Sequence, residues 1–180
     1  MDFAAIADRI DQLLPDLIEA RDTVRGRDPW IVVPGPRVPE LMQQLRDDPE
    51  LGFDLLVDLT AVDYHPDFLP KPARAKKGEE PPPEPLPARF EVHYRLRSTV
   101  HNLELLVKVH LEHSDAPSLP TVREVYPAAD WHERECWDLL GLRFEGHPDL
   151  RRILCCEDWV GHPLRKDYQF PKDYHGISAE

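Results

Sequence analysis

Apolar side chains follow first a helical and then a strand-like spacing along the first quarter of the chain. Between residues 3 and 14 they recur every three or four positions, which predicts a helix that Pro15 ends. Two short β-prone runs follow at residues 17–24 and 30–33, and the Gly, Asp and Pro residues between them favour a hairpin. A second amphipathic helix is predicted over residues 39–48.

Three longer strands are predicted next, over residues 53–62, 90–97 and 103–111. In the last two, apolar and polar side chains alternate, as in a strand with one buried and one exposed face. Only a short polar turn around Asn102 separates them, so we expect these two strands to pair antiparallel.

A proline-rich insert separates the first of these strands from the second. Eight of the chain's 20 prolines lie within residues 66–87, and the stretch from Lys76 to Pro83 has no apolar side chain that could pack. Such a composition favours a solvated, mobile loop. The alternative, a linker between two domains, is less favoured because neither half alone would have a complete sheet.

Helical turns and a helix are predicted after the sheet. Thr121 and Glu124 have the spacing of a capping box, which predicts that a helical segment begins there. Asp130 is expected to cap a helix over residues 131–140, and Gly141 fits the left-handed position that follows a helix.

Together these patterns predict an α+β fold, a single domain with a mixed sheet of about five strands and flanking helices. That domain is expected over residues 1–142, followed by an extended, irregular C-terminal arm over residues 143–180. Between residues 143 and 173 the arm has six basic and six acidic residues, whereas the whole chain has a net charge of −12. Four aromatic residues lie among these charges: Trp159, Tyr168, Phe170 and Tyr174. An ordinary solvated tail carries fewer aromatic residues, so the composition favours an arm that lies over a partner protein.

The overall composition argues against several classes of protein. An acidic chain repels nucleic-acid phosphates and anionic lipid headgroups. No stretch without Asp, Glu, Lys or Arg is longer than eight residues, whereas a membrane-spanning helix needs about 20 apolar residues. The N-terminal residues lack the basic region of a signal peptide, and three cysteines do not make a disulfide framework. A protein that faces the cytosol is therefore expected.

One group of residues resembles the start of a zinc-protease helix. His132 and Glu133 have the required order, but Cys136 stands where such a helix has its second histidine. The favoured interpretation is a charged helical face on which Arg134 and Asp138 form an ion pair.

A second group with metal-ligand character consists of His147, Cys155, Cys156 and His162. Adjacent cysteines point in different directions and rarely share one ion, so two thiols and two turn histidines are the favoured interpretation. The sequence has no glycine-rich phosphate loop and no nucleophile elbow. From the residues alone, no catalytic site is indicated.

Several segments resemble one known family. Residues 133–141 (ERECWDLLG), 146–154 (GHPDLRRIL) and 158–168 (DWVGHPLRKDY) resemble, in this order, the 30-kDa subunit family of respiratory complex I. Upstream, residues 58–64 (DLTAVDY) resemble the characteristic strand of that family. The adjacent cysteine pair and the long proline-rich insert are minor departures from the family pattern.

In bacteria, members of this family form the C subunit of the proton-translocating NADH-quinone oxidoreductase. The resemblance implies a non-catalytic subunit of the hydrophilic arm that packs against subunits D and B and holds no cofactor itself. FMN, iron–sulfur clusters and quinone then belong to partner subunits. Membrane association, at the cytoplasmic face of the bacterial inner membrane, is implied only through the complex. Two alternatives stay open: the equivalent subunit of an energy-converting hydrogenase or related dehydrogenase, and a free-standing metal-dependent hydrolase.

The resemblance and the charges also indicate an interface. No catalytic, cofactor-binding or metal-binding residue is expected in this chain. The cations of the arm are expected to bind carboxylates and backbone carbonyl groups, some within residues 133–135 and some on a neighbouring subunit. His147 and His162, each followed by a proline, are expected to fix turns. The family-motif and interface residues are Glu133, Arg134, Glu135, Asp138, His147, Arg151, Arg152, Trp159, His162, Arg165, Lys166 and Asp167.

Overall fold

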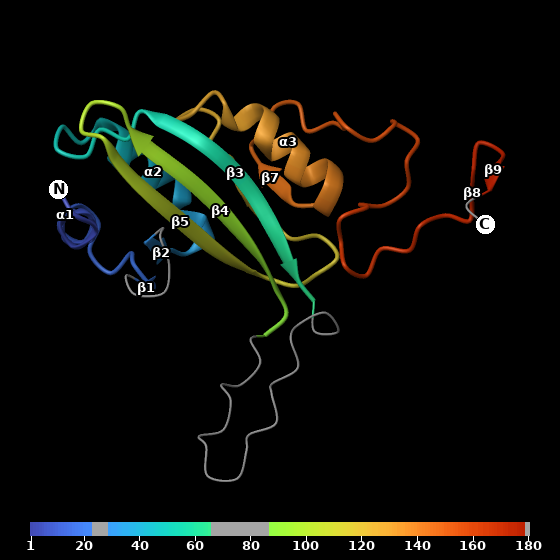
Figure 1. Ribbon diagram of the computed structural model, residues 1–180, viewed down its shortest axis with the longest axis horizontal. Coiled ribbons are helices and arrows are strands. Elements are labelled where there is room, and N and C mark those ends of the chain that lie inside the picture. The colour runs from blue at the N-terminus through green and yellow to red at the C-terminus, as the bar shows by residue number, and fades with distance from the viewer. Residues whose placement is uncertain (23–28, 66–86, 179–180) are drawn as a thin grey trace, which may run out of the picture.

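A five-stranded mixed sheet with helices forms the body of the molecule (Figure 1). The computed structural model describes residues 1–22, 29–65 and 87–178. The strands lie in the order β1-β2-β5-β4-β3. The helices are α1 (Phe3–Leu13), α2 (Val38–Asp47) and α3 (Ala129–Leu140), with a 3-10 turn, η1 (Gly35–Arg37), before α2. The strands of the sheet are β1 (Ala20–Asp22), β2 (Trp30–Val32), β3 (Leu55–Tyr64), β4 (Arg89–Ser98) and β5 (Leu103–Glu112).

Neighbouring strands pair mostly as hairpins. β4 and β5 are antiparallel from the pair Arg89–Glu112 to the pair Ser98–Leu103, which confirms the predicted hairpin. β1 and β2 are also antiparallel, as are β3 and β4. The exception is the pair of β2 and β5, which are parallel, so the sheet is mixed.

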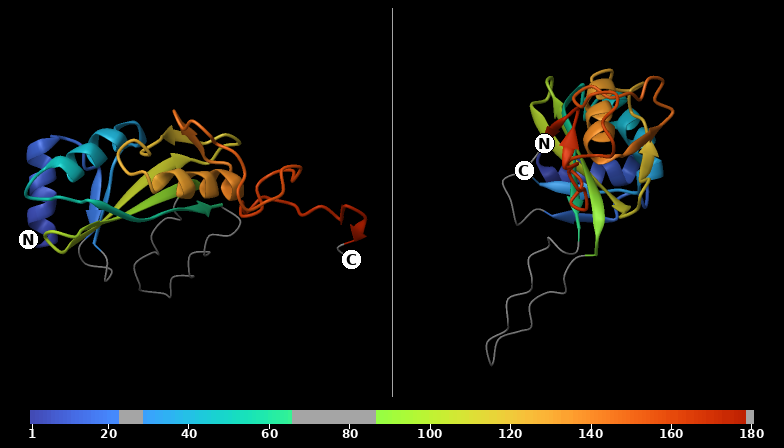
Figure 2. Two further views of the ribbon diagram at one scale, coloured as in Figure 1. Left: turned by 90° about the horizontal axis from the view of Figure 1, so that it is seen from above. Right: turned by 90° about the vertical axis from the view of Figure 1, so that its right-hand side faces the viewer.

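The two faces of the sheet differ sharply in polarity. On β4, the alternate side chains Phe90, Val92, Tyr94 and Leu96 are fully buried. Figure 2 shows α2 and α3 on the same side of the sheet, and these helices cover the apolar face. The alternation predicted for this strand therefore gives it one core face and one polar face.

A buried carboxylate organises the polar face. Glu91 lies within 2.9 Å of Arg89 and Lys108 and 2.7 Å from the ring of His93. Burial opposes the ionisation of Glu91, but hydrogen bonds from His93, Arg89 and Lys108 outweigh it and lower its pKa. The charged form of Glu91 is thus matched by cations of the same face.

Helix ends show where local sequence signals succeed and fail. α3 ends at Gly141, whose φ of 76° is left-handed, as predicted. No helix begins at Thr121: its hydroxyl accepts a hydrogen bond from the N–H of Arg123 in a turn, and Glu124 pairs with Arg123 instead of capping. Asp130 does not cap α3 either, because the helix begins one residue earlier, at Ala129.

Beyond α3 the chain adds one short strand to the body and then continues as an extended segment. Residues 118–120 and 143–145 form β6 (Ser118–Pro120) and β7 (Arg143–Glu145), a parallel pair. We call the described residues up to 145 the body and residues 146–178 the distal arm. The only strands of the distal arm are the short β8 (Asp173–Tyr174) and β9 (Ile177–Ser178).

The architecture confirms the predicted α+β class with its five-stranded mixed sheet. The proline-rich insert and the turn between β1 and β2 lie outside the described residues, apart from their flanks. Among the helices that the structure describes, none is long and apolar enough to cross a membrane.

Candidate interaction site

The distal arm extends away from the body (Figures 1 and 2) and presents apolar side chains to solvent. Its exposed large apolar residues are Leu154, Val160, Leu164, Phe170 and Ile177. Near its end, Trp159 packs with Phe170 and Tyr174, at ring-centroid distances of 6.4 and 4.9 Å. The indole N–H of Trp159 is buried and has no hydrogen-bond partner among the described residues. Exposed apolar side chains at this density are typical of an interaction surface.

One carboxylate of α3 fixes the start of the distal arm. The side chain of Asp138 is fully buried and accepts hydrogen bonds from the backbone N–H groups of Ile153, Leu154 and Cys155, at 3.0, 2.7 and 2.9 Å. Arg152 donates to its other oxygen at 2.6 Å. Burial alone would raise the pKa of Asp138, but these donors lower it to about 2. The carboxylate therefore stays charged and holds four groups of the arm.

Arg152 extends this attachment further along the arm. Its second terminal nitrogen donates to the carbonyl oxygens of Trp159 and Gly161, at 2.9 and 2.8 Å. His162 donates from Nδ1 to the carbonyl oxygen of Asp138 at 2.9 Å. One guanidinium thus ties two turns of the arm to α3, and this planar, five-donor geometry is specific to arginine.

Gly141 makes the close approach of His162 possible. A Cβ atom at this position would lie 2.7 Å from the imidazole ring, and the φ of 76° already disfavours any other residue. The glycine therefore serves both the end of α3 and the seating of the arm.

A second buried carboxylate, Glu133, ties α3 to the segment after β6. It accepts hydrogen bonds from the N–H of Val122 at 2.8 Å and from the hydroxyl of Thr121 at 2.5 Å. Its pKa is raised to about 7, because burial penalises the charge more than the two donors stabilise it. The fully buried ring of His147 lies 4.0 Å from Glu133, and its Nδ1 accepts the N–H of Asp149.

The arm touches the body again near residue 165. The N–H of Lys166 donates to the buried carboxylate of Asp63 at 2.9 Å. The guanidinium of Arg165 lies over the ring of Phe90 and donates to the carbonyl oxygen of Ser114 at 2.9 Å. Asp63 lies at the end of the strand segment DLTAVDY, so this segment contributes a direct anchor for the arm.

The structure corrects two sequence-based interpretations of charge. Arg134 and Asp138 do not form the expected pair, because both are buried and Asp138 binds Arg152 instead. The guanidinium of Arg134 lies over the ring of Trp131, and its Nε donates to the carbonyl oxygen of Arg151. The face is therefore a contact surface for the arm rather than a solvated face.

Arg152 and Arg165 bind backbone carbonyl groups, as expected, but the carboxylate partners of the arm's cations differ from those expected. Arg151 pairs with Asp149 at 3.0 Å, and Arg165 pairs with Asp167 at 3.2 Å. Of the carboxylates within residues 133–135, Glu133 is used by Thr121 and Val122, and Glu135 is exposed. The expectation that Glu133 or Glu135 would pair with cations of the arm is wrong, because buried backbone and hydroxyl donors occupy Glu133.

The candidate metal ligands do not converge. Cys136 is buried, its thiol contacts the carbonyl oxygen of Leu59, and burial raises its pKa. His132 points to Asp58, with a nitrogen–oxygen distance of 3.7 Å. Within the described part of the chain, no group of three or more His, Cys, Asp or Glu side chains could hold a metal ion.

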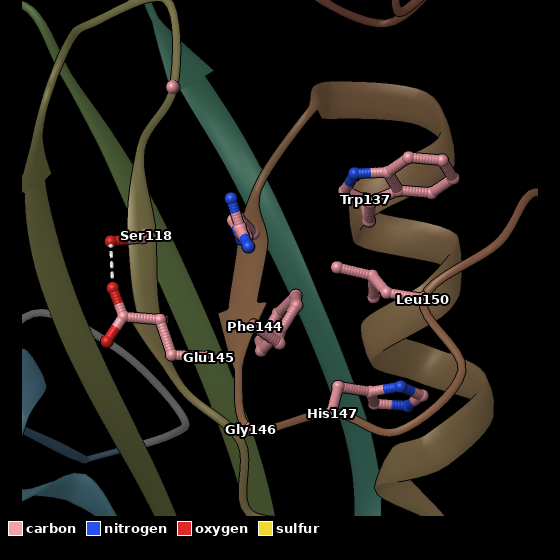
Figure 3. A pocket seen from close by; sticks show the side chains of 9 residues that line it. Ser118, Trp137, Phe144, Glu145, Gly146, His147 and Leu150 are labelled. Atoms are coloured by element: carbon pink, nitrogen blue, oxygen red, sulfur yellow. Dashed lines mark hydrogen bonds between the residues drawn. The ribbon is translucent and has the colours of Figure 1, made fainter.

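A groove lies between α3 and β7, next to the start of the distal arm (Figure 3). Its volume is about 690 Å³. Trp137 and Leu150 form one side, and Phe144 and Glu145 of β7 lie opposite, with the Glu145 carboxylate bonded to the hydroxyl of Ser118 at 2.8 Å. The groove also contains Arg143. The sequence contains no periodic signal for this groove, because its sides come from separate elements.

The sequence of this chain is similar to that of known proteins. Residues 31–174 match the family model described as respiratory-chain NADH dehydrogenase, 30 Kd subunit. The C subunit of NADH-quinone oxidoreductase from Roseiflexus sp. is 40% identical over 167 residues, which cover 93% of this chain and 84% of that protein. The protein of the same name from Moorella thermoacetica is 41% identical over 160 residues, 89% of this chain and 90% of that protein.

A solved structure shares the fold. A chain of the membrane-bound sulfane sulfur reductase, an archaeal respiratory membrane complex, superposes with a TM-score of 0.69 over 92% of this chain and 85% of that chain. Its sequence identity is 23%, so the likeness is one of fold. The family model and the two relatives decide the matter: this chain belongs to the 30-kDa subunit family of respiratory-chain NADH dehydrogenase.

Proposed function

We propose that this chain is a structural subunit of a proton-translocating NADH-quinone oxidoreductase and takes no part in the chemistry itself. The observation that carries the proposal is the family match over residues 31–174, supported by relatives of that name at about 40% identity. The polar groups buried at α3 bind the chain's own backbone and hydroxyl groups, which is a structural use.

The distal arm is the part of the chain that meets the partners. It is fixed at its start by Asp138 and Arg152, whereas its apolar residues Val160, Phe170 and Ile177 are left exposed. An arm already ordered in this way loses less conformational entropy when it binds. We assign its contacts to subunits D and B of the complex.

The redox groups of the reaction, FMN, iron–sulfur clusters and quinone, belong in this proposal to the partner subunits. The chain itself associates with the cytoplasmic face of the bacterial inner membrane through those partners. Its contribution to electron transfer is to hold the partner subunits in place, so that assembly and activity depend on it together.

Affinity purification through a tag on this chain tests the proposal. We expect the other subunits of the oxidoreductase to co-purify, and the preparation to oxidise NADH with a quinone as acceptor. Trp159→Ala should lower the yield of complex and the total activity in parallel, because it removes the central aromatic ring of the arm. Fully assembled complex with slow turnover and a changed pH profile would show that the chain takes part in the chemistry. Co-purification with hydrogenase subunits would support the alternative complex.

A further inference from the structure

The groove between α3 and β7 contains an arginine, Arg143, without a partner among the described residues. Arg143 is the one arginine of the described residues for whose guanidinium the structure gives no hydrogen bond, ion pair or aromatic ring contact among those residues. In a chain with 34 acidic and 22 basic residues, carboxylates are abundant, so an unpaired guanidinium is unexpected.

The nearest acidic residue along β7 is already engaged. Glu145 is two positions from Arg143 on the same strand, and its carboxylate accepts a hydrogen bond from Ser118 across the β6–β7 pair. The guanidinium is exposed and free to bind a planar acceptor from outside, for which its two parallel N–H donors are suited.

The opposite side of the groove is apolar and aromatic. Trp137 and Leu150 are both half-buried, and Figure 3 shows them facing the groove across from β7. Phe144, which is 2% exposed, also lines it. Tryptophan and arginine are the residue types that most often anchor protein interfaces.

Trp137 also connects the groove to the distal arm. Its ring lies 5.6 Å from the guanidinium carbon of Arg152 and 6.0 Å from the ring of His162. A partner that lies along the arm therefore reaches the groove without crossing another element.

We propose that the groove binds an extended segment of a neighbouring subunit, in which a carboxylate pairs with Arg143 and an adjacent apolar side chain packs against Trp137 and Leu150. This inference rests on the proposed function, since it requires that the chain is part of a complex. The positive charge of Arg143 favours an acidic side chain in the bound segment, and the apolar side of the groove favours an apolar side chain next to it.

Charge reversal in the assembled complex is the first test. Arg143→Glu should weaken retention of the chain in the complex by about tenfold or more at low salt, because it replaces an attraction by a repulsion, and the difference from the wild type should shrink as added salt screens both. Arg21→Glu is the control for net charge: it makes the same change of charge at a half-exposed arginine outside the groove, which pairs with Asp8 and Asp11 of α1. Equal loss in both variants would trace the effect to net charge and would overturn the proposal.

Cross-linking identifies what the groove holds. In an Arg143→Lys variant, a carbodiimide should join the new amine to a carboxylate in direct contact, and mass spectrometry of the cross-linked peptides names that residue. An acidic residue of another subunit, next to an apolar one, is the expected product. A cross-link only to this chain's own carboxylates, or none in the intact complex, would refute the inference.

The two proposals fail differently in these experiments. If the wild-type chain does not co-purify with oxidoreductase subunits, the proposed function is wrong. If it co-purifies and Arg143→Glu is retained as well as the wild type, only the groove inference is wrong.

Discussion

The body and the distal arm are held together by different forces. In the body, large apolar side chains such as Phe53, Phe90 and Phe144 are buried in one continuous core. In the distal arm, the attachment depends mainly on hydrogen bonds, including those to two buried carboxylates, Asp138 and Asp63, while several large apolar side chains remain exposed. The comparison shows that a segment can follow a defined path without an apolar core of its own, provided that hydrogen bonds fix its backbone.

Loss of a core side chain should give the largest effect and should act on the body. Phe53→Ala removes a fully buried ring and should lower the free energy of unfolding by about 3–5 kcal/mol, because the cavity closes only partly. Urea unfolding measures this difference. Phe170→Ala in the arm, where the ring is exposed, should change it by less than about 0.5 kcal/mol.

Loss of the Asp138 charge should act on the arm. Asp138→Asn removes the charged partner of the half-buried Arg152 guanidinium and replaces one acceptor oxygen by a donor, with a cost of about 3 kcal/mol. We expect trypsin to cleave the variant faster in the distal arm, while the body resists. Asp167→Asn, at an exposed carboxylate that also pairs with an arginine, is the control. Equal cleavage rates in both variants and the wild type would contradict the anchoring role of Asp138.

The two buried carboxylates of α3 should respond differently to pH, because the pKa of Glu133 is raised whereas that of Asp138 is lowered. Because the folded-state pKa of Glu133, about 7, lies above its ordinary value of 4.5, the folded protein keeps this proton in a range where the unfolded chain has released it. The resulting stabilisation is complete below pH 4.5 and is lost as the pH rises through 7. Relative to Glu133→Gln, the wild type should therefore lose up to about 3 kcal/mol between pH 4.5 and pH 8. Urea unfolding of both proteins at these two pH values measures the change, and a constant difference would count against it.

The smallest effect is expected at an exposed cation of the arm. Among the described residues, the side chain of Arg151 pairs with the exposed Asp149 alone, so Arg151→Ala should change the free energy of unfolding by at most about 0.5 kcal/mol. Arg165, which is 9% exposed and packs over Phe90, should be more sensitive to the same substitution. Thermal unfolding of the two variants compares them. Equal shifts in melting temperature would show that the second contact of the arm with the body is weak.

Much of the body could be predicted from the sequence because its buried apolar side chains recur at the regular spacing of a strand or a helix. Alternation along residues 90–97 and 103–111 predicted the β4–β5 hairpin, and Gly141 marked the end of α3. What local signals did not predict is the parallel pairing of β2 with β5, which depends on contacts between distant residues. The capping box at Thr121 failed for a related reason, because a buried glutamate of α3 competes for its hydroxyl.

The attachment of the arm could be predicted only in part. The family motifs pointed to Asp138, Arg152 and His162, which do come together. Backbone carbonyl groups were expected as partners of the cations, but the particular residues that supply them could not be predicted, because every residue has the same backbone groups. The spacing of Arg134 and Asp138 suggested a local helical pair, whereas burial and a stronger tertiary partner decided the outcome.

The parallel contact between β2 and β5 sets an order of events during synthesis. Trp30 lies beside Leu106, so the N-terminal hairpin has no place in the sheet until the ribosome has made β5. Until then, the apolar sides of α1 and α2 lack the surface that they cover, and apolar surface exposed in this way favours aggregation. The arm is translated after this step, so it reaches its partners attached to a body whose sheet can already be complete.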